Sequence, residues 1–181
     1  PTNVIFITLV VVPSLFSAFL SFTDWNFLSG LSGIKWVGLS NFKKLLADRT
    51  FVQAVINTFI YTIATVPVSL FIALVLAYVL NEKIYGKKFL RLCFFIPYVS
   101  NAVALAAVFK VLFRENGPIN MFCQYVLRME ELPRWFADSS LNKIPIILFL
   151  IWTSIGYELV VYMAAIQNIS PSLYEAAEID G

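Results

Sequence analysis

Apolar residues along the chain gather in four long runs that are separated by polar loops. The runs cover about residues 4–22, 52–80, 92–113 and 144–166. A helix of about 20 apolar residues is long enough to cross the hydrocarbon core of a bilayer, which is roughly 30 Å thick. The pattern therefore predicts an all-α fold, a polytopic transmembrane helical bundle with four spans.

The composition excludes several classes of protein. Hydrophobic residues make up 60% of the 181 residues and charged residues 13%, whereas a soluble domain has roughly 45–50% and about 25%. A net charge of +2 gives no basic surface for nucleic acid, and the chain has no histidine for acid–base or metal chemistry. Cys93 and Cys123 lack the spacing of a metal site. We expect no nucleic-acid partner, no metal and no cofactor bound by this chain.

The basic residues of the loops predict the orientation in the membrane. The short loop 81–91 carries Lys83, Lys87, Lys88 and Arg91, and loops this rich in Lys and Arg remain cytoplasmic. The longer loops 23–49 and 114–143 then face outward, and the N-terminus and the segment after residue 167 lie inside. Within the first outer loop, apolar residues recur with a helical period over residues 39–46, which predicts an amphipathic helix at the membrane interface.

Two of the spans have one polar face each. On the second span the face carries Asn57, Thr58, Tyr61, Thr62, Thr65 and Ser69, and on the fourth it carries Thr153, Ser154, Tyr157 and Glu158. Such a face either bonds neighbouring helices together or forms the wall of a solute path. The same choice is open for Glu158, which is either neutralised or hydrated locally, or handles the solute.

The last fourteen residues, 168–181, predict a short helix. Ser170 before Pro171 is a typical helix start, and Ser172 with Glu175 forms an alternative capping box. A helix of about ten residues is marginal on its own. It is therefore either a docking helix for a cytoplasmic partner or an ordinary surface helix.

This segment and several others resemble a known family. Glu175-Ala-Ala-x-x-x-Gly181, with residues 168–174 before it, resembles the EAA loop of permease subunits of binding-protein-dependent ABC importers. The carbohydrate branch of that family, of the maltose and glycerol-phosphate type, has similar motifs at Val37–Phe42, Asn57-Thr58, Phe95–Pro97, Asn116–Asn120, and Trp152 with Gly156-Tyr157.

The resemblance implies the transmembrane domain of a type I ABC importer in a bacterial inner membrane. Residues 1–50 would hold the first transmembrane helix and an outer loop, and residues 51–181 the transmembrane core, ending in a truncated coupling helix at 170–181. The chain would be a fragment that lacks about two spans. The coupling residues implied by the resemblance are Tyr174, Glu175, Ala176, Ala177, Asp180 and Gly181.

The implied partners are membrane lipid, a second permease subunit, two cytoplasmic ATPase subunits and an extracytoplasmic solute-binding protein. ATP and Mg would bind to the ATPase, since this chain has no phosphate-binding G-x-x-x-x-G-K-[ST] motif and is predicted not to be an enzyme.

The predicted solute pathway comprises Asn57, Tyr61, Thr153, Ser154, Tyr157 and Glu158. Leu150 is apolar where a polar group would suit a sugar, so the solute need not be of the maltose type. The alternatives are an ion-coupled secondary transporter or channel that uses Glu158, and a membrane scaffold without a solute path.

Overall fold

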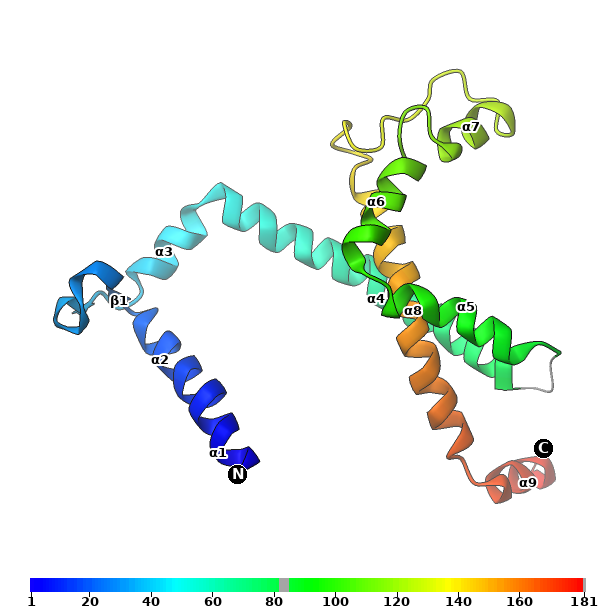
Figure 1. Cartoon of the computed structure of the whole chain (residues 1–181), viewed down its shortest axis with the longest axis horizontal. Helices are drawn as coiled ribbons and strands as arrows, with labels where there is room; N and C mark the ends of the chain where they lie inside the picture. Colours follow the sequence, from blue (N-terminus) through cyan, green and yellow to red (C-terminus); the bar gives the residue numbers. More distant parts are fainter. Residues whose placement is uncertain (82–84, 181) are drawn as a thin grey trace. The chain divides into compact units, whose positions relative to one another are not determined.

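The computed structural model of the chain describes residues 1–81 and 85–180 (Figure 1). It forms two compact units, Pro1–Phe59 and Ile60–Gly181. In the described residues, three helices are long and apolar enough to cross a membrane, and a bent helix pair adds a fourth if it counts as one span. The predicted helical membrane fold is thus confirmed.

The first unit begins with an apolar helix and continues into a folded loop. The helix runs from Thr2 to Leu20 with a π-helical turn inside it. The elements of the unit are α1 (Thr2–Phe6), η1 (Ile7–Val11), α2 (Val12–Leu20), β1 (Thr23–Asp24), η2 (Phe27–Ser29), η3 (Leu31–Gly33), β2 (Lys35–Trp36), α3 (Ser40–Ala47) and the start of α4. The helix expected around residues 39–46 is α3, whereas the short antiparallel pair of β1 and β2 was not predicted.

The Val37–Phe42 motif ties this loop to the end of α2. The side-chain amide of Asn41 donates to the carbonyl oxygens of Ser21 at 3.0 Å and Thr23 at 2.9 Å. The ring of Phe22 stacks on Trp36 with centroids 5.6 Å apart and meets the ring of Phe42 at 5.3 Å. The motif therefore has a structural role as a clasp, meaning that Asn41 and Phe42 hold the loop against the end of α2.

Helix α4 (Arg49–Asn81) is 33 residues long and carries a buried stripe in its second half. Ser69, Ala73 and Ala77 repeat every four residues, so they lie on one face, and each is at most 2% exposed. Ala77 and Leu80 pack with Leu159 and Met163 of α8 (Lys143–Gln167). Small side chains on this face leave room for the larger ones of its neighbours.

The third apolar run, predicted as a span at about 92–113, is not one continuous helix. It forms two helices, α5 (Lys87–Val99) and α6 (Ala102–Leu112), bent by 100°. The amide of Ser100 donates to the carbonyl of Ile96 and ends α5. The side chain of Asn101 accepts from the amides of Val103 at 2.9 Å and Ala104 at 3.3 Å, and so starts a new helix.

Helix α8 packs closely against α5 (Figure 1). A Cβ atom at Gly156 of α8 would lie 2.4 Å from the carbonyl oxygen of Phe94 and 3.0 Å from the Cα atom of Phe95. Only glycine allows the two backbones to approach this closely. One turn earlier on α8, Trp152 contacts Phe109 of α6 with ring centroids 5.5 Å apart, which favours packing as the role of that tryptophan.

The loop between α6 and α8 contains α7 (Pro118–Tyr125) and is organised by Asn120, which is 1% exposed. Its amide donates to the carbonyl oxygens of Glu115 and Pro133, both at 3.0 Å, and its oxygen accepts from the indole of Trp135 at 2.7 Å. The chain of this unit ends in α9 (Pro171–Asp180).

Candidate functional site

A pocket of about 400 Å³ lies beside the break between α5 and α6. The last turn of α5 and the first turn of α6 form one wall, and one face of α8 forms the other. Four residues of the predicted solute pathway line it, namely Thr153, Ser154, Tyr157 and Glu158. The structure therefore brings the polar face of α8 together around a single hollow.

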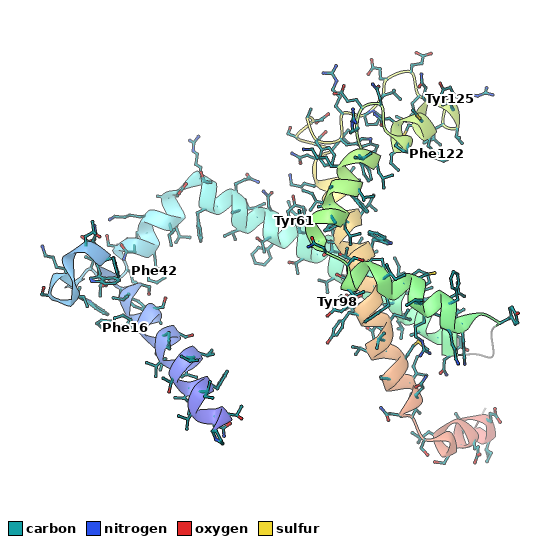
Figure 2. The ribbon with its side chains drawn as sticks, in the orientation of Figure 1. Phe16, Phe42, Tyr61, Tyr98, Phe122 and Tyr125 are labelled. Atoms are coloured by element: carbon teal, nitrogen blue, oxygen red, sulfur yellow. The ribbon has the colours of Figure 1, made fainter. Side chains whose placement is uncertain are left out.

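Two stacked tyrosines form an aromatic wall in this pocket. The rings of Tyr98, from α5, and Tyr157, from α8, have centroids 5.3 Å apart and planes inclined by 28°. Figure 2 places Tyr98 where α5 runs beside α8. Each of the two residues is about half exposed, so the pair presents an apolar surface to a molecule in the pocket. Sugar rings bind to surfaces of this kind through their C–H groups.

The hydroxyl groups around the pocket are partly engaged by the helix backbone. Thr153 Oγ1 donates to the carbonyl oxygen of Phe149 at 2.9 Å, and Ser100 Oγ donates to that of Ile96 at 2.7 Å. A hydroxyl that donates in this way keeps lone pairs that still accept. These two side chains therefore offer acceptors to the pocket.

Glu158 links α8 to α4. Its Oε1 accepts a hydrogen bond from Ser69 Oγ at 2.9 Å. Among the described residues its Oε2 is buried and has no hydrogen-bond donor. The partner found for Glu158 is thus a serine hydroxyl and not a basic side chain, and a carboxylate placed here is costly unless something else compensates it.

The other two residues of the predicted pathway do not line this pocket. Asn57 belongs to the first unit, where its side-chain oxygen accepts from Gln53 Nε2 at 3.1 Å. Tyr61 is half-buried on α4 (Figure 2). The polar face of α4 is instead buried at Thr65 and Ser69, which supports helix packing as the role of that part of the face.

The predicted coupling residues lie on α9, which begins at Pro171. The amide of Leu173 donates to the carbonyl oxygen of Ser170 at 3.0 Å, in keeping with a helix start at the Ser-Pro pair. The residues that the structure leaves exposed on this helix include Glu175, Ala176, Ala177 and Asp180. The side chain of Tyr174 and all of Gly181 lie outside the described residues.

Sequence reasoning missed the contribution of the helix break. Tyr98 and Ser100 line the pocket, although neither was among the predicted site residues. A signal was present, because Asn101 after Pro97 and before an apolar run is a typical helix start. Leu150, noted as an apolar departure, also lines the pocket.

A family model described as "Binding-protein-dependent transport system inner membrane component" matches residues 44–181. The chain belongs to this family. It is 33% identical over 181 residues to the "Probable ABC transporter permease protein YurN" of Bacillus subtilis, covering 98% of this chain and 61% of the relative. It is 37% identical over 149 residues to the "Lactose transport system permease protein LacF" of Rhizobium radiobacter, covering 82% and 50%.

The fold also matches a solved structure, that of a bacterial ABC transporter involved in the import of the acidic polysaccharide alginate. The TM-score is 0.75 at 22% identity, with 100% of this chain and 60% of the other covered. The chain thus spans about 60% or less of the length of these relatives. The predicted class, an inner-membrane permease of multi-pass type, is confirmed.

Proposed function

We propose that the protein is a permease subunit of an ATP-driven importer and forms half of the pathway for a sugar. The observation that carries this proposal is the continuity of one element. Helix α8 lines the pocket with Thr153, Ser154 and Tyr157 and then leads, through residues 168–170, directly into α9. A movement of α9 by a partner would therefore be transmitted along α8 to the pocket.

The substrate class follows from the pocket and from the relatives. Stacked tyrosines beside hydroxyl and carboxylate groups suit a polyhydroxylated ring, whose faces are apolar and whose edges form hydrogen bonds. The names of the relatives include lactose, starch degradation products and multiple sugars, and one structural relative concerns alginate. A sugar is the class common to these names.

The remaining parts of the assembly are those that the family requires. The exposed acids and alanines of α9 would enter a cleft of a cytoplasmic ATPase, two copies of which bind ATP and Mg. A second permease would complete the pathway, and an extracytoplasmic binding protein would deliver the sugar to surfaces formed by residues 38–49 and 116–143. In this orientation the N-terminus and α9 are cytoplasmic.

The first experiment tests coupling to the ATPase. The complete subunit, extended beyond residue 181, is purified from membranes with its native neighbours, and the associated ATPase activity is measured. We expect Glu175→Lys to abolish the association, because it reverses the charge of an exposed docking side chain. Asp24→Lys, a charge reversal on an exposed residue of the first unit, is the matched control and should retain the ATPase. If the intact form carries no ATPase, the proposal fails.

The second experiment tests the pocket. Tyr157→Ala removes half of the aromatic wall and should weaken the apparent affinity for the transported sugar in uptake assays. Tyr78→Ala removes an exposed tyrosine on α4 and serves as the control. Unchanged affinity and rate in Tyr157→Ala would remove this residue from the solute pathway.

A further inference from the structure

The end of α5, beside the pocket, carries backbone acceptors that have no partner within the helix. The last carbonyl groups of a helix have no partner within that helix. At the end of α5 the amide of Ser100 takes the carbonyl of Ile96, and in the described part of the chain no amide reaches those of Pro97, Tyr98 and Val99. Helix carbonyls point toward the C-terminal end, so these three point toward the break, and the negative end of the helix dipole does as well.

On the other side of the break, the amides of residues 103–105 are already occupied. Asn101 accepts from the amides of Val103 and Ala104 with its side chain, and from that of Leu105 with its carbonyl oxygen at 3.1 Å. The free amides at the start of a helix are what bind an anion. Because Asn101 uses them, the start of α6 offers little to a phosphate or a carboxylate.

The side chains add further acceptors to the free carbonyls of α5. Thr153 and Ser100 donate their hydroxyl protons to the backbone and so present lone pairs. Glu158 adds a carboxyl group, and the residues that line the pocket in the described structure include no lysine or arginine. The described lining thus carries a carboxyl group and no cation to balance a negative charge.

We propose that this pocket selects uncharged sugars against anionic ones, an inference that rests on the proposed sugar-permease function. The hydroxyl groups of a neutral sugar donate to the free carbonyls of α5, while the ring stacks on Tyr98 and Tyr157. A uronate or a sugar phosphate brings a negative charge close to the carboxyl group of Glu158, with no lysine or arginine among the described lining residues to balance it. Burying a charge without a partner is expensive.

The test is direct binding of sugars to the complete permease assembly, purified without its binding protein so that only the membrane site selects. The probes are radiolabelled lactose, maltotriose and raffinose, which are neutral, and digalacturonate, which is anionic. We expect at least one neutral sugar to bind, and digalacturonate to compete for it about tenfold or more weakly than the same unlabelled sugar.

A variant identifies the groups responsible. Glu158→Gln keeps the size of the side chain and an acceptor for Ser69 but removes the carboxylate. It should reduce the difference in affinity between the neutral and the anionic sugar severalfold. Asp24→Asn, which removes an exposed carboxylate of the first unit, should leave this difference unchanged. Size-exclusion chromatography of both variants verifies that the assembly is intact.

The outcomes separate the two levels of the proposal. If digalacturonate binds as well as the neutral sugars, the sugar function stands and the charge selectivity is wrong. If the difference in affinity in Glu158→Gln equals that of the unmodified assembly, Glu158 has no part in the selection. If none of the four sugars binds, and none stimulates ATP hydrolysis when the binding protein is added, the sugar function itself fails.

Discussion

Gly156 is a position where one added carbon atom should disturb the packing of two helices. In Gly156→Ala the Cβ atom would lie 2.4 Å from the carbonyl oxygen of Phe94 and 3.0 Å from the Cα atom of Phe95. Both obstructing atoms belong to the backbone of α5, so no side-chain rotation relieves the clash and the two helices must separate. Overpacking of this kind costs about 3 kcal/mol at the upper end of its usual range, and the better helix propensity of alanine offsets about 1 kcal/mol.

The net loss of about 2 kcal/mol should lower the melting temperature of the complete permease assembly by a few degrees, since the shift per kcal/mol falls as the protein grows. Thermal unfolding in detergent, followed by tryptophan fluorescence, measures this shift. Gly156→Leu should be worse, because the obstruction grows with side-chain size, whereas Val161→Ala, at an exposed position of the same helix, should have little effect. Sugar affinity should fall in parallel, since Tyr157 moves with α8. A Gly156→Ala protein as stable as the unmodified one would refute the close-packing argument.

Three further predictions concern the loops. Asn120→Ala removes three hydrogen bonds and should destabilise residues 113–143 by about 2–4 kcal/mol, seen as faster hydrogen–deuterium exchange confined to that loop. Asn41→Ala should cost about 1–2 kcal/mol and accelerate proteolysis within residues 21–42; an unchanged cleavage pattern would contradict the role of the clasp. The pKa of Asp138 lies below its ordinary value of 3.8, because the hydroxyl and amide of Ser140 donate to its carboxylate. Its contribution is therefore present above that value and lost as the pH falls through the lowered pKa, so local exchange should rise in acid and Asp138→Asn should abolish this dependence.

The long apolar helices were predictable because their signal is local. Length and hydropathy alone define α4 and α8, and the spacing of Thr153, Ser154 and Tyr157 is enough to put them on one face. The start of α9 could also be predicted, because the Ser-Pro pair at 170–171 favours a helix start through contacts within a single turn. These features depend on the sequence of one segment and not on its neighbours.

The helix break and the pocket beside it depend on contacts between segments. The hydropathy pattern does not reveal the end of α5, because Ser100 and Asn101 interrupt the apolar run too briefly to change its mean hydropathy. Nothing in the sequence near Gly156 says which backbone passes beside it, and the pairing of Tyr98 with Tyr157 joins residues far apart in the chain. Glu158 could be recognised as a costly group, but its partner Ser69 lies on another helix.

The Asn120 contacts have a practical consequence for labelling the protein. The side chain of Asn120 binds the carbonyl oxygens of Glu115 and Pro133 and so holds the two ends of this loop segment together. The helices on either side therefore do not fix the number of residues between Asn120 and Pro133. Epitope tags or a reactive cysteine inserted among the exposed residues 124–130 should therefore be tolerated. A membrane-impermeant reagent applied to whole cells would then report directly which side of the bilayer this loop occupies.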